Sequence, residues 1–398
     1  MPVSDNTTIA ILGSFPPLRG ISSYCLEMAT AMAAHARVAF ISFKHIYPGF
    51  LYPGGRPADD DSFPAIDQPN LRVRRRLTWY NPLSWLREGL LTPANLLHAQ
   101  WWSMPLAPIY GAVAGLFKLR RKPVVFTVHN AVSHEKSPLF TLVSKWLFKL
   151  GDHFIVHTKR NARQMQCLYG VPAAKISIIP HGSLDFQVNA DTDRQAVRRE
   201  LGFHPNDKVV LVFGAIRPYK GVATAIRAIA AVRESVPEAK LLIAGKLWED
   251  WAPYQQLITR LGMEDAVASH LHYIPAAEVH RFFAAADLAL LPYRHFDSQS
   301  GVGSSAMAFG TPLIVSDVGG LPDLVPDRRC VVTPGDPKAL AAAVTAILTT
   351  PSLLAEITAG MAGLREHFSW ARIAAQTMDV YRDVRPHPSH LRLGQGRA

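Results

Sequence analysis

Cysteine is scarce in this chain of 398 residues, and neither a leader-like segment nor a long apolar run is present. The three cysteines are scattered, and no two of them have the CxxC spacing of a metal or redox site. The longest weakly polar stretch, 104–117, is interrupted by Pro105 and Pro108. It falls short of the ~20 apolar residues that a membrane-spanning helix needs. We therefore expect a cytoplasmic protein of a reducing compartment, without a transmembrane helix or a metal site.

Nucleic-acid-binding signatures are also missing, although the formal net charge is +11. Because the charges are spread out, anionic lipid or a phosphorylated small molecule is favoured over nucleic acid as a partner. The densest cationic cluster is followed by aromatic and apolar residues: Arg72, Arg74, Arg75, Arg76, Trp79, Tyr80, Trp85 and Leu86. Cations beside aromatics suit peripheral contact with an anionic membrane, and a solvated loop beside a core segment explains this composition equally well.

What the sequence does contain is an alternation of short apolar strands and amphipathic helices, which is typical of parallel sheets covered on both faces. The length indicates two domains. A shift to charged and polar residues over 183–207 marks the boundary between an N-terminal domain (1–188) and a C-terminal domain (189–369). We predict an α/β fold of two doubly wound, Rossmann-like domains with a cleft between them. The first βαβ unit lacks the G-x-G-x-x-G spacing, so no dinucleotide is inferred.

In the second half, the first predicted strand leads into a cationic loop. The strands predicted there are Val209–Phe213, Lys240–Ala244, Ser269–Tyr273, Leu288–Leu291, Pro312–Ser316 and Cys330–Val332. After the first of them come Gly214, a short loop with Arg217 and Lys220, and an apolar-periodic helix. A helix N-terminus offers unpaired N–H groups and a partial positive charge, to which Arg and Lys add whole charges. The loop therefore predicts an anion site, and a surface loop with two solvated cations is the alternative.

Polar residues also stand at and beyond the carboxyl end of the predicted strand 123–128. They are Thr127, His129, Asn130, His134 and Glu135. Ligands bind beyond the carboxyl ends of strands in open α/β sheets, so we predict that His129 donates to a sugar hydroxyl or a phosphate. A capped loop with a satisfied histidine is the alternative. The acidic triplet 59–61 is interpreted as a solvated loop and not as a metal–diphosphate site, because no strand precedes it.

Eight segments match one family in their order along the chain. They are FPPLRGISSY (15–24), VFTVH (125–129), IPHG (179–182), FGAIRPYKG (213–221), LLIAGK (241–246), ADLALLPY (286–293), AMAFGTPLIVSDVGGLPDLV (306–325) and FSWARIAAQTMDVY (368–381). Together they resemble the group 1, or family 4, retaining glycosyltransferases with the GT-B fold. The resemblance implies a nucleotide-sugar donor held mainly by the C-terminal domain, an acceptor on the N-terminal domain and retention of the anomeric configuration. It also implies a final helix, about 370–385, that packs back on the N-terminal domain.

The resemblance assigns the donor diphosphate to Arg217 and Lys220, with close approach of the backbone at Gly20. Gly301 and Val302 lie in a small-residue stretch before a predicted helix, which suits this stretch to offer N–H groups to phosphate. Positioned cations stabilise the charge that grows on a leaving diphosphate more in the transition state than in the ground state. With that charge stabilised, no metal or other cofactor is required.

This chain departs from the family pattern at the donor side. The family's pair of glutamates falls on Asp297 and Ser305, which the resemblance places at the donor sugar and at the ribose. Asp297 keeps a carboxylate on a shorter arm, whereas Ser305 cannot make a bidentate contact. Arg19 replaces one of two glycines in the first loop. Gly245 and Tyr273 complete the predicted nucleotide side.

The catalytic residues that the resemblance implies come from both domains, and the acceptor-side residues come from the N-terminal domain. The catalytic set is His129, Arg217, Lys220 and Asp297, and the acceptor side is Asn130, His134 and Glu135. Because no pair of carboxylates with a glycosidase arrangement is present, a front-side displacement fits, in which a phosphate oxygen takes the acceptor proton.

The sequence thus predicts a hexosyltransferase that uses a UDP- or GDP-sugar. It extends a glycan or lipid-linked acceptor in surface polysaccharide biosynthesis, at the inner face of the cytoplasmic membrane. The alternative is a non-catalytic relative that binds a glycan or acts as a scaffold, which the replacement of a glutamate by Ser305 motivates. A phosphorylase or epimerase of the same fold is less favoured.

Overall fold

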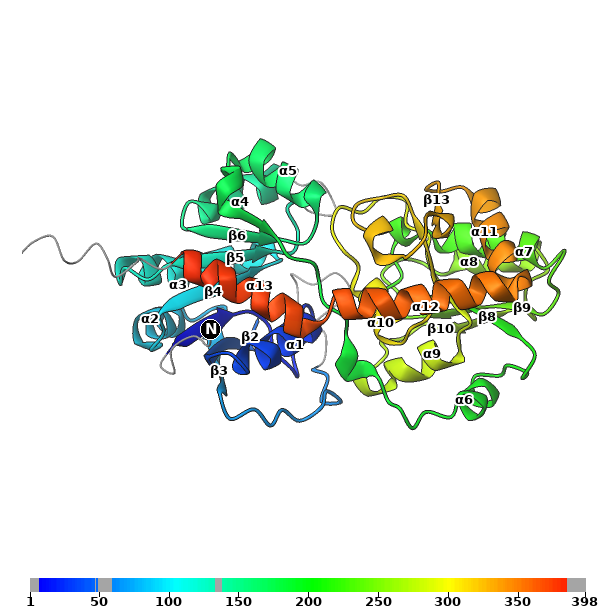
Figure 1. Cartoon of the computed structure of the whole chain (residues 1–398), viewed down its shortest axis with the longest axis horizontal. Helices are drawn as coiled ribbons and strands as arrows, with labels where there is room; N and C mark the ends of the chain where they lie inside the picture. Colours follow the sequence, from blue (N-terminus) through cyan, green and yellow to red (C-terminus); the bar gives the residue numbers. More distant parts are fainter. Residues whose placement is uncertain (1–6, 47, 49–58, 133–137, 385–398) are drawn as a thin grey trace, which may run out of the picture.

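The computed structural model describes residues 7–46, 48, 59–132 and 138–384, and the chain forms two α/β domains that lie side by side (Figure 1). Each domain is built on one parallel sheet, of seven strands in the N-terminal domain and six in the C-terminal domain. The prediction of two Rossmann-like, doubly wound domains is therefore confirmed.

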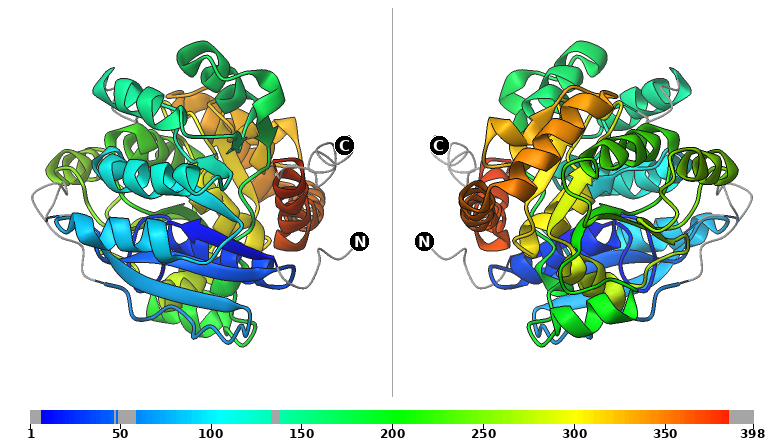
Figure 2. Two further views of the ribbon diagram at one scale, coloured as in Figure 1. Left: turned by 90° about the vertical axis from the view of Figure 1, so that its left-hand side faces the viewer. Right: turned by 90° about the vertical axis from the view of Figure 1, so that its right-hand side faces the viewer.

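The N-terminal sheet has the strand order β3-β2-β1-β4-β5-β6-β7. Its strands are β1 (Thr8–Leu12), β2 (Arg37–His45), β3 (Leu71–Thr78), β4 (Leu96–Trp101), β5 (Val124–Val128), β6 (His153–Val156) and β7 (Ile176–Ile178). Side chains alternate between the faces, so that Ile9 and Ile11 pack toward α1 (Ser22–Ala33) while Ala10 and Leu12 face the opposite side. That opposite side is covered by further helices (Figure 2). They are α2 (Pro82–Leu91), α3 (Ala107–Leu119), α4 (Pro138–Phe148) and α5 (Lys159–Tyr169).

The arginine cluster lies in the edge strand β3, which the sequence does not predict. Arg74 pairs with the buried carboxylate of Glu88 at 2.7 Å. Trp79 and Trp85 donate their indole N–H groups to backbone carbonyls, each at 2.8 Å. The interpretation of this cluster as a solvated loop is wrong, because strand pairing and these contacts hold it in the domain.

The C-terminal sheet has the order β10-β9-β8-β11-β12-β13. Its strands are β8 (Lys208–Phe213), β9 (Ala239–Ala244), β10 (Val267–His270), β11 (Leu288–Leu291), β12 (Leu313–Ser316) and β13 (Val331–Val332). Its helices are α6 (Arg194–Glu200), α7 (Val222–Val232), α8 (Ala252–Arg260), α9 (Val279–Ala285), α10 (Gly301–Ala308), α11 (Pro337–Thr349) and α12 (Pro351–His367). Five of the six predicted strands agree with these bounds to within one residue. The sixth, predicted as 269–273, is wrong in position because β10 ends at His270, which leaves Tyr273 beyond the strand.

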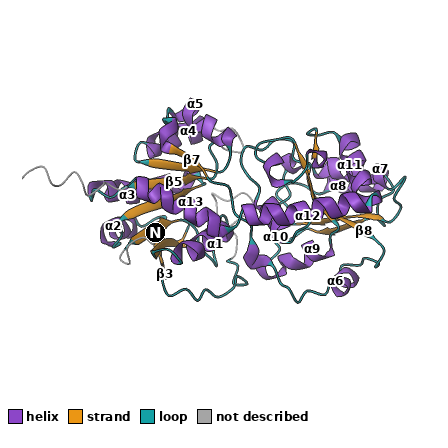
Figure 3. Ribbon diagram, in the orientation of Figure 1, coloured by secondary structure: helices purple, strands orange, loops and turns teal. Residues whose placement is uncertain are grey.

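The last helix, α13 (Trp370–Asp383), crosses from the C-terminal domain and packs beside α1 (Figures 1 and 3). Its Ile373 and Tyr381 are buried in the core shared with α1, and the Tyr381 hydroxyl lies 2.5 Å from Nδ1 of His98. At the crossing, the indole of Trp370 donates to the carbonyl of Ser183 at 2.6 Å. The chain passes between the domains once near Ser183 and again near Trp370, and this hydrogen bond joins the two passages.

Within the part of the chain that the structure describes, no single helix is long and apolar enough to cross a bilayer. One pair, 337–349 with 351–383, reaches the required length and composition only jointly, and it is bent by 99°.

Candidate active site

A cavity of about 390 Å³ lies between the two domains. Loops after β1, β5 and β8 and the start of α10 contribute to its lining. It brings together seven predicted site residues: Gly20, His129, Asn130, Lys220, Gly301, Val302 and Ser305. Ligands of doubly wound sheets bind at the carboxyl ends of the strands, which is the edge that these loops form.

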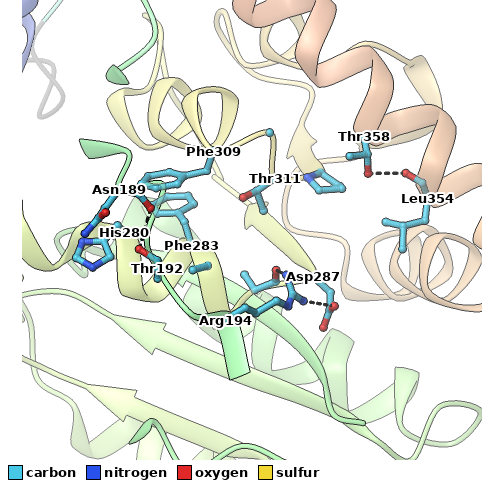
Figure 4. A pocket seen from close by; sticks show the side chains of 14 residues that line it. Asn189, Thr192, Arg194, His280, Phe283, Asp287, Phe309, Thr311, Leu354 and Thr358 are labelled. Carbon is cyan, nitrogen blue, oxygen red and sulfur yellow. Dashed lines mark hydrogen bonds and ion pairs between the residues drawn. The ribbon is translucent and has the colours of Figure 1, made fainter. Parts of the chain in front are cut away.

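A second cavity, of about 360 Å³, lies within the C-terminal domain beside Phe283 and Phe309 (Figure 4). Asp287 and Pro312, which also line it, directly precede β11 and β12, so this cavity lies at the amino ends of the strands. None of the predicted site residues that the structure describes lines it. The cavity between the domains is therefore the candidate active site.

Lys220 is buried under the loop that follows β8, although lysine is seldom buried without a charged partner. Its Nζ donates to the carbonyl oxygen of Phe213 at 3.2 Å and lies 5.6 Å from the centroid of the Tyr293 ring. Burial, with a smaller contribution from Arg217, lowers the pKa of Lys220 to about 7. An anion in the cavity would favour the charged form and raise this pKa.

Two glycines allow the loop after β8 to approach its neighbours. Gly221, between η5 (Pro218–Lys220) and α7, has φ 71°, and a Cβ there would lie 2.0 Å from the carbonyl oxygen of Pro292. A Cβ on Gly245 would lie 2.1 Å from the carbonyl oxygen of Gly214. Gly245 does not line the cavity, so its contact in this structure is with the loop after β8.

Arg217 and Asp297 do not line the cavity, although the sequence predicts both at the donor. The guanidinium carbon of Arg217 lies 4.0 Å from the centroid of the Trp248 ring. The carboxylate of Asp297 pairs with Arg160 at 2.8 Å and accepts a hydrogen bond from Gln164 at 3.3 Å. Because these partners belong to α5, Asp297 connects the two domains in this structure.

Polar groups in α10 and in the segment before it line the cavity. Ser305 lines the cavity, and its Oγ donates to Oε1 of Gln187, another lining residue, at 2.7 Å. Ser298 also lines it, and this buried hydroxyl has no hydrogen-bond partner among the described residues. Small residues are required in α10, since a Cβ on Gly303 would lie 2.5 Å from the Leu324 side chain. A helix start with free N–H groups suits a phosphate.

Three histidines at neighbouring strand ends converge on the cavity: His129 after β5, His157 after β6 and His181 after β7. Nδ1 of His129 lies 3.2 Å from Nε2 of His157, and Nε2 of His129 lies 3.1 Å from Oε1 of Gln100. Nδ1 of His157 lies 3.0 Å from the carbonyl oxygen of Ile179. Both ring nitrogens of His129 therefore lie within hydrogen-bonding distance of another side chain, which fixes the orientation of the ring.

Burial keeps this histidine group neutral. Desolvation lowers the pKa of His129 well below its ordinary value and lowers the pKa values of His157 and His181 to about 3 and about 4. The ring of Tyr24 packs against all three imidazoles, with centroid distances of 4.6–5.6 Å. A neutral imidazole has one donor and one acceptor, so this group can orient hydroxyls without supplying positive charge.

Tyr273 contacts the N-terminal domain and does not line the cavity. Its hydroxyl donates to Oδ2 of Asp60 at 2.7 Å, and the N–H of Ala276 donates to the same oxygen at 3.0 Å. The guanidinium carbon of Arg19 lies 3.4 Å from the centroid of the Tyr273 ring. Asp60 is buried, so the interpretation of 59–61 as a solvated loop is wrong at this residue, because donors from the other domain hold its carboxylate.

The acceptor-side prediction is described only in part. Asn130 lines the cavity, and its Nδ2 donates to the carbonyl oxygen of Trp102 at 3.3 Å. His134 and Glu135 lie outside the described residues. Within the residues that are described, no three His, Cys, Asp or Glu side chains are grouped so that they could hold a metal ion.

His157 and His181 are candidate functional residues that the sequence prediction missed. Each follows a strand at its carboxyl end, and β5, β6 and β7 are neighbours in the sheet. Inspecting every strand end of the predicted sheet would have found both. Gln187, in contrast, follows no predicted strand, and no local pattern points to it.

Two family models match the chain, one for each domain. Glycosyltransferase Family 4 matches residues 18–183, and Glycosyl transferases group 1 matches residues 193–360. The D-inositol 3-phosphate glycosyltransferase of Segniliparus rotundus is 30% identical over 306 residues, which cover 72% of this chain and 66% of that protein. D-inositol 3-phosphate glycosyltransferase 2 of Catenulispora acidiphila is 28% identical over 308 residues, which cover 72% of this chain and 70% of that protein. The alignments thus span about two thirds of these relatives.

Solved structures share the architecture over nearly the whole chain. Anabaena Alr3699/HepE in complex with UDP-glucose has a TM-score of 0.72 at 20% identity and covers 95% of this chain and 100% of that one. Sucrose-phosphate synthase from Thermosynechococcus elongatus has a TM-score of 0.69 at 19% identity and covers 95% of this chain and 99% of that one. The family models and the common two-domain fold show that the chain belongs to the group 1, or family 4, glycosyltransferases with the GT-B fold.

Proposed function

We propose that this protein transfers a hexose from a UDP- or GDP-sugar to a hydroxyl of a glycan or lipid-linked acceptor, in surface polysaccharide biosynthesis. The observation that carries the proposal is the cavity in which buried Lys220 and the start of α10 face the histidine group across the domain boundary. Family membership and the UDP-glucose complex of the similarly folded HepE support a nucleotide-sugar donor.

In the proposed complex, the donor diphosphate lies beside Lys220 and the N–H groups of Gly301 and Val302. The C1–O bond to the diphosphate breaks during transfer, and the leaving oxygen gains negative charge. Lys220 and the helix start stabilise that charge more in the transition state than in the ground state. Arg217 joins them after leaving Trp248. These groups make a metal ion unnecessary for the reaction as we propose it.

The acceptor hydroxyl is proposed to approach beside His129 and Asn130. Among the described residues that line the cavity, none is Asp or Glu, so none of these side chains is placed to act as a carboxylate nucleophile. We therefore favour a front-side displacement, in which the acceptor oxygen bonds to C1 and its proton passes to the leaving phosphate oxygen. The product then keeps the anomeric configuration of the donor. Asp297 could reach the sugar only after release from Arg160.

Titration calorimetry with UDP- and GDP-sugars tests the donor site. Lys220→Ala should weaken donor binding at least about tenfold, because a hydrogen-bonded charge pair is lost. Lys240→Ala is the matched control, since Lys240 lies in the same domain and bonds to the backbone of Asp265 outside the cavity. Unchanged affinity in a folded Lys220→Ala protein would reject this donor site.

A non-catalytic glycan-binding or scaffold protein is the second candidate, because Ser305 stands where a glutamate is expected and Asp297 lies outside the cavity. Incubation of donor with glycan, lipid-linked and inositol phosphate acceptors distinguishes the two. The inositol phosphate is included because it appears in the names of the relatives. Product that Lys220→Ala abolishes supports the transferase, and its anomeric proton coupling reports retention. A chelator added to the same assay tests metal independence. Donor binding without transfer or donor hydrolysis supports the binding protein.

A further inference from the structure

Large apolar side chains are exposed mainly on one part of the N-terminal domain. Thirteen such side chains are exposed among the described residues, and nine of them lie between residues 80 and 146. The nine are Tyr80, Leu83, Leu86, Leu90, Leu91, Leu119, Leu139, Leu142 and Trp146. Grouped apolar surface of this kind marks a contact with a partner or a membrane, whereas single exposed leucines do not.

Helices α2 and α4 carry outward apolar stripes with the same spacing. Leu83, Leu86 and Leu90 of α2 stand at i, i+3 and i+7, and Leu139, Leu142 and Trp146 of α4 repeat that spacing. These positions fall on one side of a helix. The side chains are 43–73% exposed, and α4 buries a different set, which includes Phe140 and Leu147, in the domain. The stripes are therefore apolar surfaces that the core of the domain does not use.

The two stripes belong to one layer. α3 contacts both α2 and α4, and all three helices lie on the face of the N-terminal sheet opposite α1 and α13 (Figures 2 and 3). Leu119 at the end of α3 is 75% exposed. We call the exposed side chains of α2, α3 and α4, together with Tyr80, the outer helical surface.

The charged side chains around this surface are mainly cationic. Residues 80–150 contain eight Lys or Arg residues and two Glu residues, and one of the cations, Lys118 of α3, pairs at 2.6 Å with Asp152 just beyond this range. Of the two glutamates, Glu88 is buried and paired with Arg74, and Glu135 lies outside the described residues. Arg87, Lys145 and Lys149 are exposed beside the stripes, and Nζ of Lys149 lies 3.7 Å from the centroid of the Trp146 ring. Leucine and tryptophan flanked by long cationic side chains suit the boundary between lipid headgroups and acyl chains.

We propose that the outer helical surface docks on a bilayer that contains anionic lipid. The charge argues against a second copy of this chain as the occupant, because two such surfaces would bring like charges together. An anionic bilayer complements the cations and accepts the leucine and tryptophan side chains at once. Docking needs neither donor nor acceptor, so this inference goes beyond the proposed function and can fail independently of it.

Co-sedimentation of the full chain with vesicles tests the proposal. The protein should pellet with phosphatidylcholine vesicles that contain phosphatidylglycerol, bind vesicles of phosphatidylcholine alone at least about tenfold more weakly, and be partly released by salt. Leu142→Ser with Trp146→Ser, and separately Leu83→Ser with Leu90→Ser, should each lower the partition coefficient about tenfold or more, because apolar burial is lost. Lys145→Gln with Lys149→Gln should lower it only for the anionic vesicles.

Leu168→Ser with Leu261→Ser is the matched control, because these exposed leucines lie outside the outer helical surface. It should bind vesicles like the wild type. Each variant is also titrated with UDP-glucose in the absence of lipid, which shows that the fold is intact and keeps the donor site separate from docking. Wild-type protein that fails to pellet with anionic vesicles overturns the proposal. So does a dimer in solution that the leucine and tryptophan substitutions dissociate, since the surface would then bind a second copy.

Discussion

Lys220 is buried at a position that disfavours the charged form of its side chain. Burial lowers its pKa to about 7, which lies below the ~10.4 of a lysine in the unfolded chain. Below pH 7 both states are protonated and the folded protein bears the full cost of the buried charge. That cost is relieved as pH rises from about 7 toward about 10, so this residue adds to stability in that range. A bound diphosphate removes the same cost by supplying the missing negative charge.

Donor binding should therefore depend on pH with a defined sign. A diphosphate raises the pKa of Lys220, so binding takes up a proton when the free protein is above pH 7. Affinity for UDP-glucose should be constant below about pH 6 and should fall by up to about tenfold per pH unit above pH 7. Calorimetry in buffers with different ionisation enthalpies measures the proton uptake directly. In Lys220→Arg the charge persists at all these pH values, so any remaining binding should lose the pH dependence. Wild-type binding without proton uptake at about pH 8 would contradict this account.

At the scale of elements, the cavity depends on close approaches between loops and helix starts. Gly221 brings the start of α7 against the carbonyl of Pro292, and Gly303 lets α10 pack against Leu324. Both glycines stand beside groups that the proposed diphosphate contacts. The backbone in these turns thus positions the donor site as much as the charged side chains do.

Substituting Gly221 should damage both fold and site. Gly221→Ala forces a Cβ into the Pro292 carbonyl as well as a left-handed conformation, so we expect a loss of stability of roughly 3 kcal/mol and a loss of donor binding. Gly262→Ala is the matched control, because Gly262 has φ 61° with no atom within 4 Å of the added Cβ. It should cost only about 1 kcal/mol and leave donor binding intact. Urea unfolding and UDP-glucose titration measure both effects. Equal losses in the two variants would show that the contact with Pro292 is unimportant.

Element positions were largely predictable from the sequence, and contacts between distant segments were not. Strands such as β8 and β11 are buried runs with an unambiguous pattern, so their bounds are found to within a residue. β3 was missed because its four arginines hide the alternation of an edge strand. Lys220, His129 and Gly301 were predicted from local signals and do line the cavity. Asp297 and Tyr273 do not, because their partners, Arg160 and Asp60, come from another domain and no local pattern encodes that pairing.

At the scale of the whole molecule, several polar contacts around the cavity connect the two domains, and two of them depend on a carboxylate. Asp60 accepts from Tyr273 and Ala276, and Asp297 binds α5 through Arg160 and Gln164. The pair with Arg160 is largely exposed and contributes little, whereas the buried carboxylate of Asp60 contributes more. We therefore expect the Asp60 contact to stabilise the closed arrangement of the domains more than the Asp297 contact does.

Removing that carboxylate should open the protein. Asp60→Ala leaves the Tyr273 hydroxyl and the Ala276 N–H without their acceptor, which should weaken domain closure by about 1–3 kcal/mol. Small-angle X-ray scattering should then give a larger radius of gyration than for the wild type, and UDP-glucose should reduce the difference. Asp59→Ala is the control, because the neighbouring Asp59 is exposed. Identical scattering from Asp60→Ala and wild type would show that other contacts keep the domains closed.

The chain passes between the domains twice, and the two passages are joined at one place. Ser183 donates its N–H to the carbonyl of Phe368 at 3.2 Å and accepts from the indole of Trp370, and a Cβ on Gly182 would lie 2.4 Å from that ring. A single connection would leave the domains free to rotate and to translate relative to each other. Two connections that are bonded to each other restrict the translation and leave rotation about the point where they meet. His181 stands two residues before Ser183, so its side of the cavity lies beside the axis of that rotation and should move little when the domains open or close.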